Sequence, residues 1–208
     1  MTVKGRQATS ARAKIRPVPL LQTPTDPRWV TVALADLDRT LQDHAHCEKK
    51  AAASAVKLVA DHPDRPGQVR ALAKLAQEEL QHFLQILSEL SARGLPLPPD
   101  PGDPYVQALL AQVRGGQGGP AARLCDRLLV CALVEARSCE RLQLLADALP
   151  DPRLAGVYAR LAQSEGGHEL LFLDLAREVD PGADARAEVL AAEEARIVAA
   201  LPVLPRIH

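Results

Sequence analysis

The sequence predicts an all-α fold: a four-helix bundle with one long crossover and an extra C-terminal helix. Ala and Leu dominate the 208 residues and aromatic residues make up only 2%, which favours closely packed helices over a β-sandwich. Several long segments repeat apolar residues with the three-four spacing of a helix. The connections between the four longest run short, long, short, so we expect two antiparallel hairpins joined by a single crossover, which is the ferritin-like pattern.

Residues 1–26 form a basic, proline-rich arm ahead of the first predicted helix. The arm shows no helical period, and proline removes backbone donors, so we expect an extended segment. An Arg-rich start without acidic residues is also compatible with a transit peptide, although an arm that wraps around the domain is the preferred interpretation. Residues 27–201 are expected to form one bundle domain, and residues 202–208 a C-terminal tail.

The first hairpin follows the arm. Its first helix should begin near Asp26-Pro27, a capping residue followed by proline, and continue unbroken along an apolar stripe that extends from Val30 to Val59. Residues 61–67 then form a tight corner. The second helix should run to about Arg93, and Gly94 fits the left-handed position that ends many helices.

The second hairpin follows a long connection over residues 94–119, in which we expect a short helix at 104–114. The glycine-rich end of this connection lacks the Gly-Lys-Ser/Thr of a phosphate loop, so we interpret it as a flexible joint. The third and fourth helices should span about 120–149 and 152–179, and the extra helix 184–201. Gly166-Gly167 in the fourth helix predicts close approach of a neighbouring helix, a metal or a substrate.

Two Glu-x-x-His pairs stand on these apolar stripes, Glu79 with His82 and Glu165 with His168. A mid-helix glutamate precedes each pair, Glu48 by 31 residues and Glu135 by 30. An unpaired carboxylate in an apolar seam is costly, and a metal ion removes that cost. Four helices that supply Glu, Glu-x-x-His, Glu and Glu-x-x-His therefore predict a carboxylate-bridged two-metal site. The alternative is a solvated helix face or a hydrogen-bonded core histidine.

The third helix carries two candidate glutamates, and we expect Glu135 to face the metals. Five residues advance a helix by about 140° around its axis, so Glu135 and Glu140 cannot both point inward. Glu135 keeps the apolar period, whereas Glu140 shares a face with Arg137 and suits an ion pair near the surface or behind the ligands. His44, one turn before Glu48, is a further candidate to contact a ligand, although an ordinary polar role is preferred.

Carboxylate and imidazole ligands around an open site favour iron, with manganese as the second choice. Two ferrous ions can deliver electrons to O2 and produce an oxidant that attacks an unactivated C–H bond. Ala45, Ala52, Ala132 and Ser138 are small and should leave room for an apolar substrate group beside the metals.

The remaining composition limits location and partners. No segment reaches the length of a membrane span, and no apolar signal region opens the chain. The four cysteines have no Cys-x-x-Cys spacing and fit small buried residues in a reducing cytoplasm. The net charge of −1 means that any nucleic-acid affinity must come from a local patch.

Four segments resemble the bacterial tRNA 2-methylthio-N6-isopentenyladenosine hydroxylases over about residues 20–200. These segments are 43–52, 78–83, Ser164 to His168 and the most specific run, Glu135-Ala136-Arg137-Ser138-Cys139-Glu140-Arg141. The resemblance implies a ferritin-like, non-haem di-iron monooxygenase that hydroxylates the isopentenyl group of the modified adenosine next to the tRNA anticodon. It would use O2 and electrons from a redox protein. Carried over by position, the metal ligands are Glu48, Glu79, His82, Glu135, Glu165 and His168.

Contacts with tRNA and the oligomeric state are less constrained by the sequence. The basic residues that could line one end of the bundle with the arm are Lys49, Lys50, Arg137, Arg141, Arg153 and Arg160, although each singly fits a solvated surface charge. We expect a monomer or small homo-oligomer.

The competing functions are an iron-storage or oxidase protein, a di-iron oxygenase with another substrate such as an acyl chain, and a metal-free helical bundle used for protein contacts.

Overall fold

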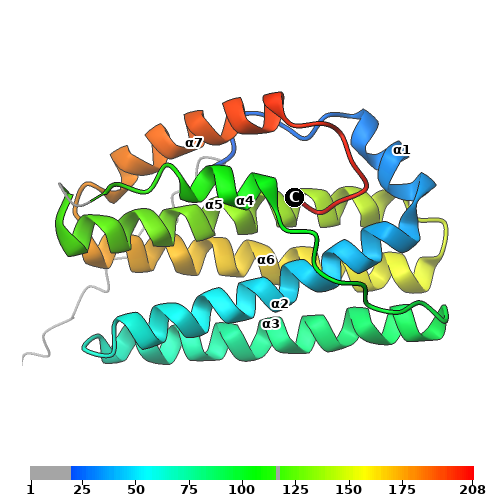
Figure 1. Ribbon diagram of the computed structural model, residues 1–208, viewed down its shortest axis with the longest axis horizontal. Coiled ribbons are helices and arrows are strands. Elements are labelled where there is room, and N and C mark those ends of the chain that lie inside the picture. Colours follow the sequence, from blue (N-terminus) through cyan, green and yellow to red (C-terminus); the bar gives the residue numbers. More distant parts are fainter. Residues whose placement is uncertain (1–19, 116–117) are drawn as a thin grey trace, which may run out of the picture.

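The computed structural model describes residues 20–115 and 118–208, and within these ranges every regular element is an α-helix. The helices are α1 (Arg28–Ala35), α2 (Leu37–Asp61), α3 (Pro66–Ala92), α4 (Pro104–Leu110), α5 (Gly119–Ala148), α6 (Pro152–Val179) and α7 (Ala183–Ala200). The antiparallel pairs α2–α3 and α5–α6 form the bundle, and the connection that contains α4 runs back along its length (Figure 1). The predicted fold class is confirmed.

The first predicted helix is wrong in one respect, because it is two helices with a break at Asp36. The apolar period continues through the break, but the chain bends there, and the Asp36 side chain accepts a hydrogen bond from the backbone of Arg39 at 3.2 Å. Thr40 then donates its hydroxyl to the carbonyl of Ala33, which ties the two helices together. This capping at Asp36 starts α2 afresh.

The other helix ends agree with the sequence prediction to within a few residues, apart from the end of α4. Of the glycines singled out in the sequence, Gly94 behaves as predicted. Gly94 has the left-handed φ of 69° expected after α3, whereas α4 stops at Leu110, earlier than predicted. No neighbouring helix approaches Gly166-Gly167 closely among the described residues. A Cβ on Gly166 would make ordinary contact with Cys139 at 3.5 Å, and one on Gly167 would meet nothing.

The apolar core consists of two clusters separated along the bundle axis. One gathers around Leu128 and Phe172 and includes α4 and α7, and the other gathers around Trp29 and Leu142. The glutamates and histidines predicted to bind metal lie between the clusters on all four bundle helices, as Glu135 does between Ala132 and Leu142 on α5. The bundle therefore has a buried polar layer near its middle.

The segments outside the bundle also pack against it. Residues 1–19 of the predicted arm lie outside the described residues, as do Gly116 and Gln117 of the predicted flexible joint. Of the part that is described, Thr25 is buried and donates its backbone N–H and hydroxyl to Glu140. The segment 202–208 turns back over the bundle (Figure 1), where it contacts α2 and α5. Ile207 in this segment is completely buried.

Candidate metal centre

The six predicted ligands come together in the polar layer as two overlapping groups. Each group has four side chains whose ligand atoms all lie within 4.8 Å of one another. One group is Glu48, Glu79, His82 and Glu165, and the other is Glu79, Glu135, Glu165 and His168. Because Glu79 and Glu165 belong to both groups, the arrangement would suit two metal ions that share these two carboxylates.

Distances within the layer show that the side chains converge on shared space. His82 Nδ1 lies 3.3 Å from Glu165 Oε1 and 3.6 Å from Glu48 Oε2. His168 Nδ1 lies 2.7 Å from Glu79 Oε1. Nevertheless both oxygens of Glu79, one of Glu165 and Nδ1 of His82 are buried without a hydrogen bond of acceptable geometry among the described residues. Lone pairs that approach one another without bonding fit a cation between them better than a hydrogen-bonded network.

The electrostatics of the layer agree with a cation site. Burial raises the pKa of Glu135 well above its usual value, and the carboxylates of Glu79 and Glu165 raise it further. Burial and the neighbouring Glu165 also raise the pKa of Glu79 to about 7. Burial alone would lower the pKa of His168, but its contacts with Glu165 and Glu79 raise it to about 11. Without metal, protons must therefore compensate the clustered carboxylates, and divalent cations would take over that role.

Two side chains behind the ligands hold them in place. His44 Nε2 lies 2.6 Å from Glu48 Oε1, and its other ring nitrogen lies 3.3 Å from the hydroxyl of Tyr158. His44 therefore contacts a predicted ligand, which is the less favoured of the two roles that the sequence suggests. Glu78 lies 3.0 Å from His168 Nε2. Sequence reasoning missed Glu78, although its position next to Glu79 was the available signal.

Arg137 and Glu140 serve a different part of the molecule. Arg137 is completely buried and donates to Glu194 of α7 at 2.7 Å and to Glu140 at 2.6 Å. Glu140 also accepts from Thr25. These contacts attach α7 and the segment before α1 to α5. The expectation that Arg137 faces tRNA is wrong, because its guanidinium is covered.

Comparisons with known proteins agree with this geometry. The family model for tRNA-(MS[2]IO[6]A)-hydroxylase (MiaE) matches residues 14–208. The chain belongs to the MiaE family. A tRNA 2-(methylsulfanyl)-N(6)-isopentenyladenosine(37) hydroxylase from Pseudomonas putida is 38% identical over 164 residues, which cover 79% of this chain and 78% of that protein. A protein of the same name from Salmonella typhimurium is 36% identical over 105 residues, covering 50% of this chain and 37% of the relative.

A solved structure extends the similarity of this MiaE-family chain to three dimensions. The protein, described as protein 43 with aldehyde deformylating oxygenase activity from Synechococcus, is 40% identical and superposes with a TM-score of 0.85. The match covers 92% of this chain and 96% of the other. Within the described ranges, no helix of this chain is long and apolar enough to cross a membrane.

A cavity of about 100 Å³ adjoins the polar layer, between α2, α4 and α5. The carboxylates of Glu48 and Glu135 line it, and most of the remaining wall is apolar. Of the four small residues expected beside the metals, Ser138 lines this cavity, whereas Ala45 and Ala132 belong to the core clusters. Ala52 is buried but does not line the cavity. The apolar wall also includes Ala51, Val106, Leu110, Val130, Val134 and Phe172.

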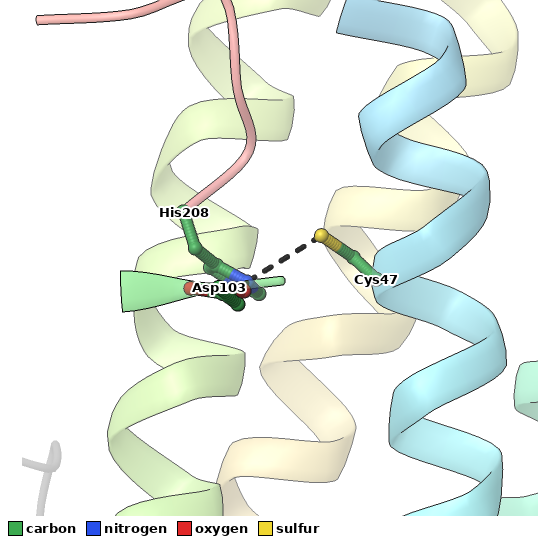
Figure 2. A group of neighbouring side chains, drawn as sticks. All are labelled: Cys47, Asp103 and His208. Carbon is green, nitrogen blue, oxygen red and sulfur yellow. Dashed lines mark hydrogen bonds and ion pairs between the residues drawn. The ribbon is translucent and has the colours of Figure 1, made fainter. Parts of the chain in front are cut away.

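The segment 202–208 contributes an unpredicted residue to one side of this cavity. His208 Nε2 lies 2.7 Å from the hydroxyl of Ser138, and its Nδ1 lies 3.3 Å from Asp103 and 3.5 Å from the Cys47 thiol. Figure 2 shows the His208 ring pointing toward Cys47. Ring-to-hydroxyl and ring-to-carboxylate hydrogen bonds account for this group without a metal ion.

Cys47 and Cys125 are buried as predicted, whereas Cys131 and Cys139 are partly exposed.

Proposed function

We propose that this chain is a non-haem di-iron monooxygenase that hydroxylates the isopentenyl group of 2-methylthio-N6-isopentenyladenosine next to the anticodon of tRNA. The observation that carries the proposal is the pair of four-residue groups that share Glu79 and Glu165 beside an apolar cavity. Membership of the MiaE family and the names of the relatives supply the substrate.

In this proposal Glu48 and His82 would hold one ion and Glu135 and His168 the other, and Glu79 and Glu165 would contribute to both. Oxygen and imidazole donors without thiolate fit iron, with manganese as the second choice. Glu78 and His44 fix the orientation of His168 and Glu48 from behind, as outer partners of metal ligands commonly do.

When bound, the di-iron centre supplies the electrons that activate O2. One oxygen atom enters a C–H bond of the isopentenyl group, the other leaves as water, and a redox protein provides the two electrons, with two protons taken up from solvent. The chain's own residues hold the alkyl group against the carboxylates: Val106, Val130 and Phe172 offer apolar contact and exclude water from the reacting carbon. We further propose a cytoplasmic enzyme that acts as a monomer or small homo-oligomer.

The test is hydroxylation by the purified chain. The protein would be loaded with ferrous iron under anaerobic conditions, then given O2, a reductant and tRNA that carries the unhydroxylated nucleoside. Chromatography of the digested tRNA should show a nucleoside heavier by one oxygen atom, and ¹⁸O2 should label it. Glu135→Ala should abolish this product, whereas Gln77→Ala, on the exposed side of α3, should not. An iron-loaded protein that leaves the tRNA unchanged would refute the proposal.

A second candidate is an oxygenase that acts on an aldehyde. The relative with a TM-score of 0.85 is described as having aldehyde deformylating oxygenase activity, and the apolar cavity is compatible with an alkyl chain. Parallel assays with a medium-chain aldehyde and with tRNA separate the two: formate release without tRNA hydroxylation would favour the second candidate.

A further inference from the structure

Arg127, on α5, occupies a position between the interior and the surface. It lines the buried cavity together with Glu48 and Glu135, and it also lines a surface groove of about 320 Å³ at the end of the bundle. The groove is formed by residues at the end of α2, the connection after α4 and the start of α5: Leu58, Asp61, His62, Val113, Pro120, Arg123 and Leu124. Arg127 thus stands where the cavity meets the groove.

The guanidinium of Arg127 is incompletely paired inside the protein. Its Nε is buried and has no hydrogen-bond partner in residues 20–115 and 118–208. A buried donor left without a partner destabilises the fold, so its presence calls for an explanation. Lys50, the other Lys or Arg side chain that lines the cavity, also has a buried Nζ without a hydrogen bond in the described part of the chain, but that ammonium is neutralised by ion pairs with Asp103 at 3.5 Å and Asp100 at 3.7 Å. Arg127 is therefore the better candidate to meet an anion that comes from outside.

The position of Arg127 along the bundle fits one end of an extended ligand. It precedes Glu135 by eight residues, which corresponds to about 12 Å along the axis of α5. Cys131 lies between the two positions, opposite Ser54 of α2, and lines the same cavity. A ligand whose alkyl end is at the carboxylates and whose body extends toward the groove would bring its outer end to Arg127.

We propose that Arg127 binds a backbone phosphate of the modified nucleotide while the isopentenyl group enters the cavity. This inference rests on the function proposed above and adds the entry route and the anchor for the substrate. A guanidinium suits a phosphate because it offers parallel donors and keeps its charge when partly buried. The cavity of about 100 Å³ takes the alkyl group, and the groove leaves space for the rest of the nucleotide. Arg123, exposed in the groove one turn earlier on α5, adds positive charge along the route.

The inference is tested by binding measurements that compare probes with and without a phosphate. Calorimetry would give dissociation constants for the 2-methylthio-N6-isopentenyladenosine nucleoside and for its 5′- and 3′-monophosphates. We expect the better monophosphate to bind the wild-type protein roughly 10- to 100-fold more tightly than the nucleoside, as expected for hydrogen bonds between charged groups. Arg127→Gln should lose this gain in affinity but bind the nucleoside as tightly as wild type. Arg127→Lys should keep part of the gain from the phosphate. The matched control is Arg39→Gln, an exposed arginine on α2 that lines neither the cavity nor the groove.

Three results would overturn the inference, and the first two are no gain from either phosphate in the wild-type protein and the same gain in Arg127→Gln. A loss of nucleoside affinity in Arg127→Gln equal to its loss of nucleotide affinity would also overturn it, because that result indicates a role in shaping the cavity. Binding of an anticodon stem-loop RNA, with and without the modified nucleoside, distinguishes failure of the Arg127 inference from failure of the proposed function. If the wild-type protein does not prefer the modified stem-loop to the unmodified one, the function itself is wrong. If it does, Arg127→Gln should reduce the salt dependence of stem-loop binding by about one phosphate contact.

Discussion

The carboxylate of Glu78 lies 3.0 Å from Nε2 of His168, the ring nitrogen opposite the one that faces Glu79 and Glu165. A proton held on Nε2 by this contact leaves the lone pair of Nδ1 directed into the polar layer. Glu78 itself is largely exposed, with 55% of its side chain accessible. It therefore acts on the site only through the orientation of the imidazole.

Glu78→Ala should weaken metal binding while leaving the fold intact. Loss of such an outer partner typically lowers metal affinity about 10- to 100-fold. The measurement is anaerobic titration with ferrous iron, followed by metal analysis of the desalted protein. Gln77→Ala is the matched control, since Gln77 is the exposed neighbour of Glu78 on α3. Equal affinities for the two variants would show that the Glu78 contact does not orient His168.

Glu135→Ala and Glu140→Ala should affect different properties: the first should lower the bound iron, and the second should lower the stability of the fold. Glu135 is buried in the polar layer with Glu79 and Glu165, so its removal should leave one ion poorly held and lower the bound iron. Glu140 binds Thr25 and Arg137, so its removal should leave iron bound and reduce the free energy of unfolding by about 1–3 kcal/mol. Iron analysis and denaturant unfolding measure the two effects. An iron-free Glu140→Ala protein together with an iron-loaded Glu135→Ala protein would reverse the assignment.

The buried ion pair between Arg137 and Glu194 should be a major contributor to the docking of α7. Both side chains are completely buried, and the hydroxyl of Tyr105 also donates to Glu194 at 3.0 Å. Glu194→Gln removes the charge opposite Arg137 and should cost roughly 3–5 kcal/mol of unfolding free energy, near the lower end because Glu140 still pairs with Arg137. The control is Glu193→Gln, whose partner Arg196 is exposed. Similar unfolding curves for the two variants would contradict this prediction.

The bundle and its polar layer could be predicted because each rests on a local pattern. Apolar periodicity predicts the helices, and a carboxylate in the apolar stripe predicts a buried site, so Glu48 and Glu135 were recognisable without coordinates. The prediction that Glu135 and Glu140 face different surroundings required only helix geometry: Glu135 lies in the polar layer, and Glu140 contacts Thr25.

The parts that could not be predicted depend on contacts between distant segments. Arg137 looked like a surface charge because nothing in its own helix shows that Glu194 of α7 covers it. The position of His208 depends on Asp103 and Ser138, which lie 105 and 70 residues away along the chain. The break at Asp36 escaped notice because the apolar period passes through it unchanged. Periodicity identifies the inward face of a helix but does not identify the segments that pack outside the bundle.

The last prediction concerns pH and the carboxylate of Asp103, which lies 3.3 Å from Nδ1 of His208. Burial alone would raise the pKa of Asp103, but its hydrogen bond with His208, the N–H of Val106 and the charge of Lys50 lower it below its usual value. A carboxylate with a lowered pKa stabilises the fold at pH values above its unfolded pKa of about 3.9, and this contribution disappears as the pH falls through the lower folded value.

Asp103→Asn should therefore reduce the free energy of unfolding by about 1–3 kcal/mol at pH 7, and the difference from wild type should narrow as the pH falls below about 4. Asparagine can still accept the hydrogen bond from Val106 that caps α4, so the substitution removes mainly the charge. Urea unfolding at pH 7, 5, 4 and 3 measures the difference, with Asp64→Asn, in the exposed turn between α2 and α3, as the control. A difference that stays constant over this range, or a variant as stable as wild type at pH 7, would show that the Asp103 charge does not stabilise the segment that carries His208.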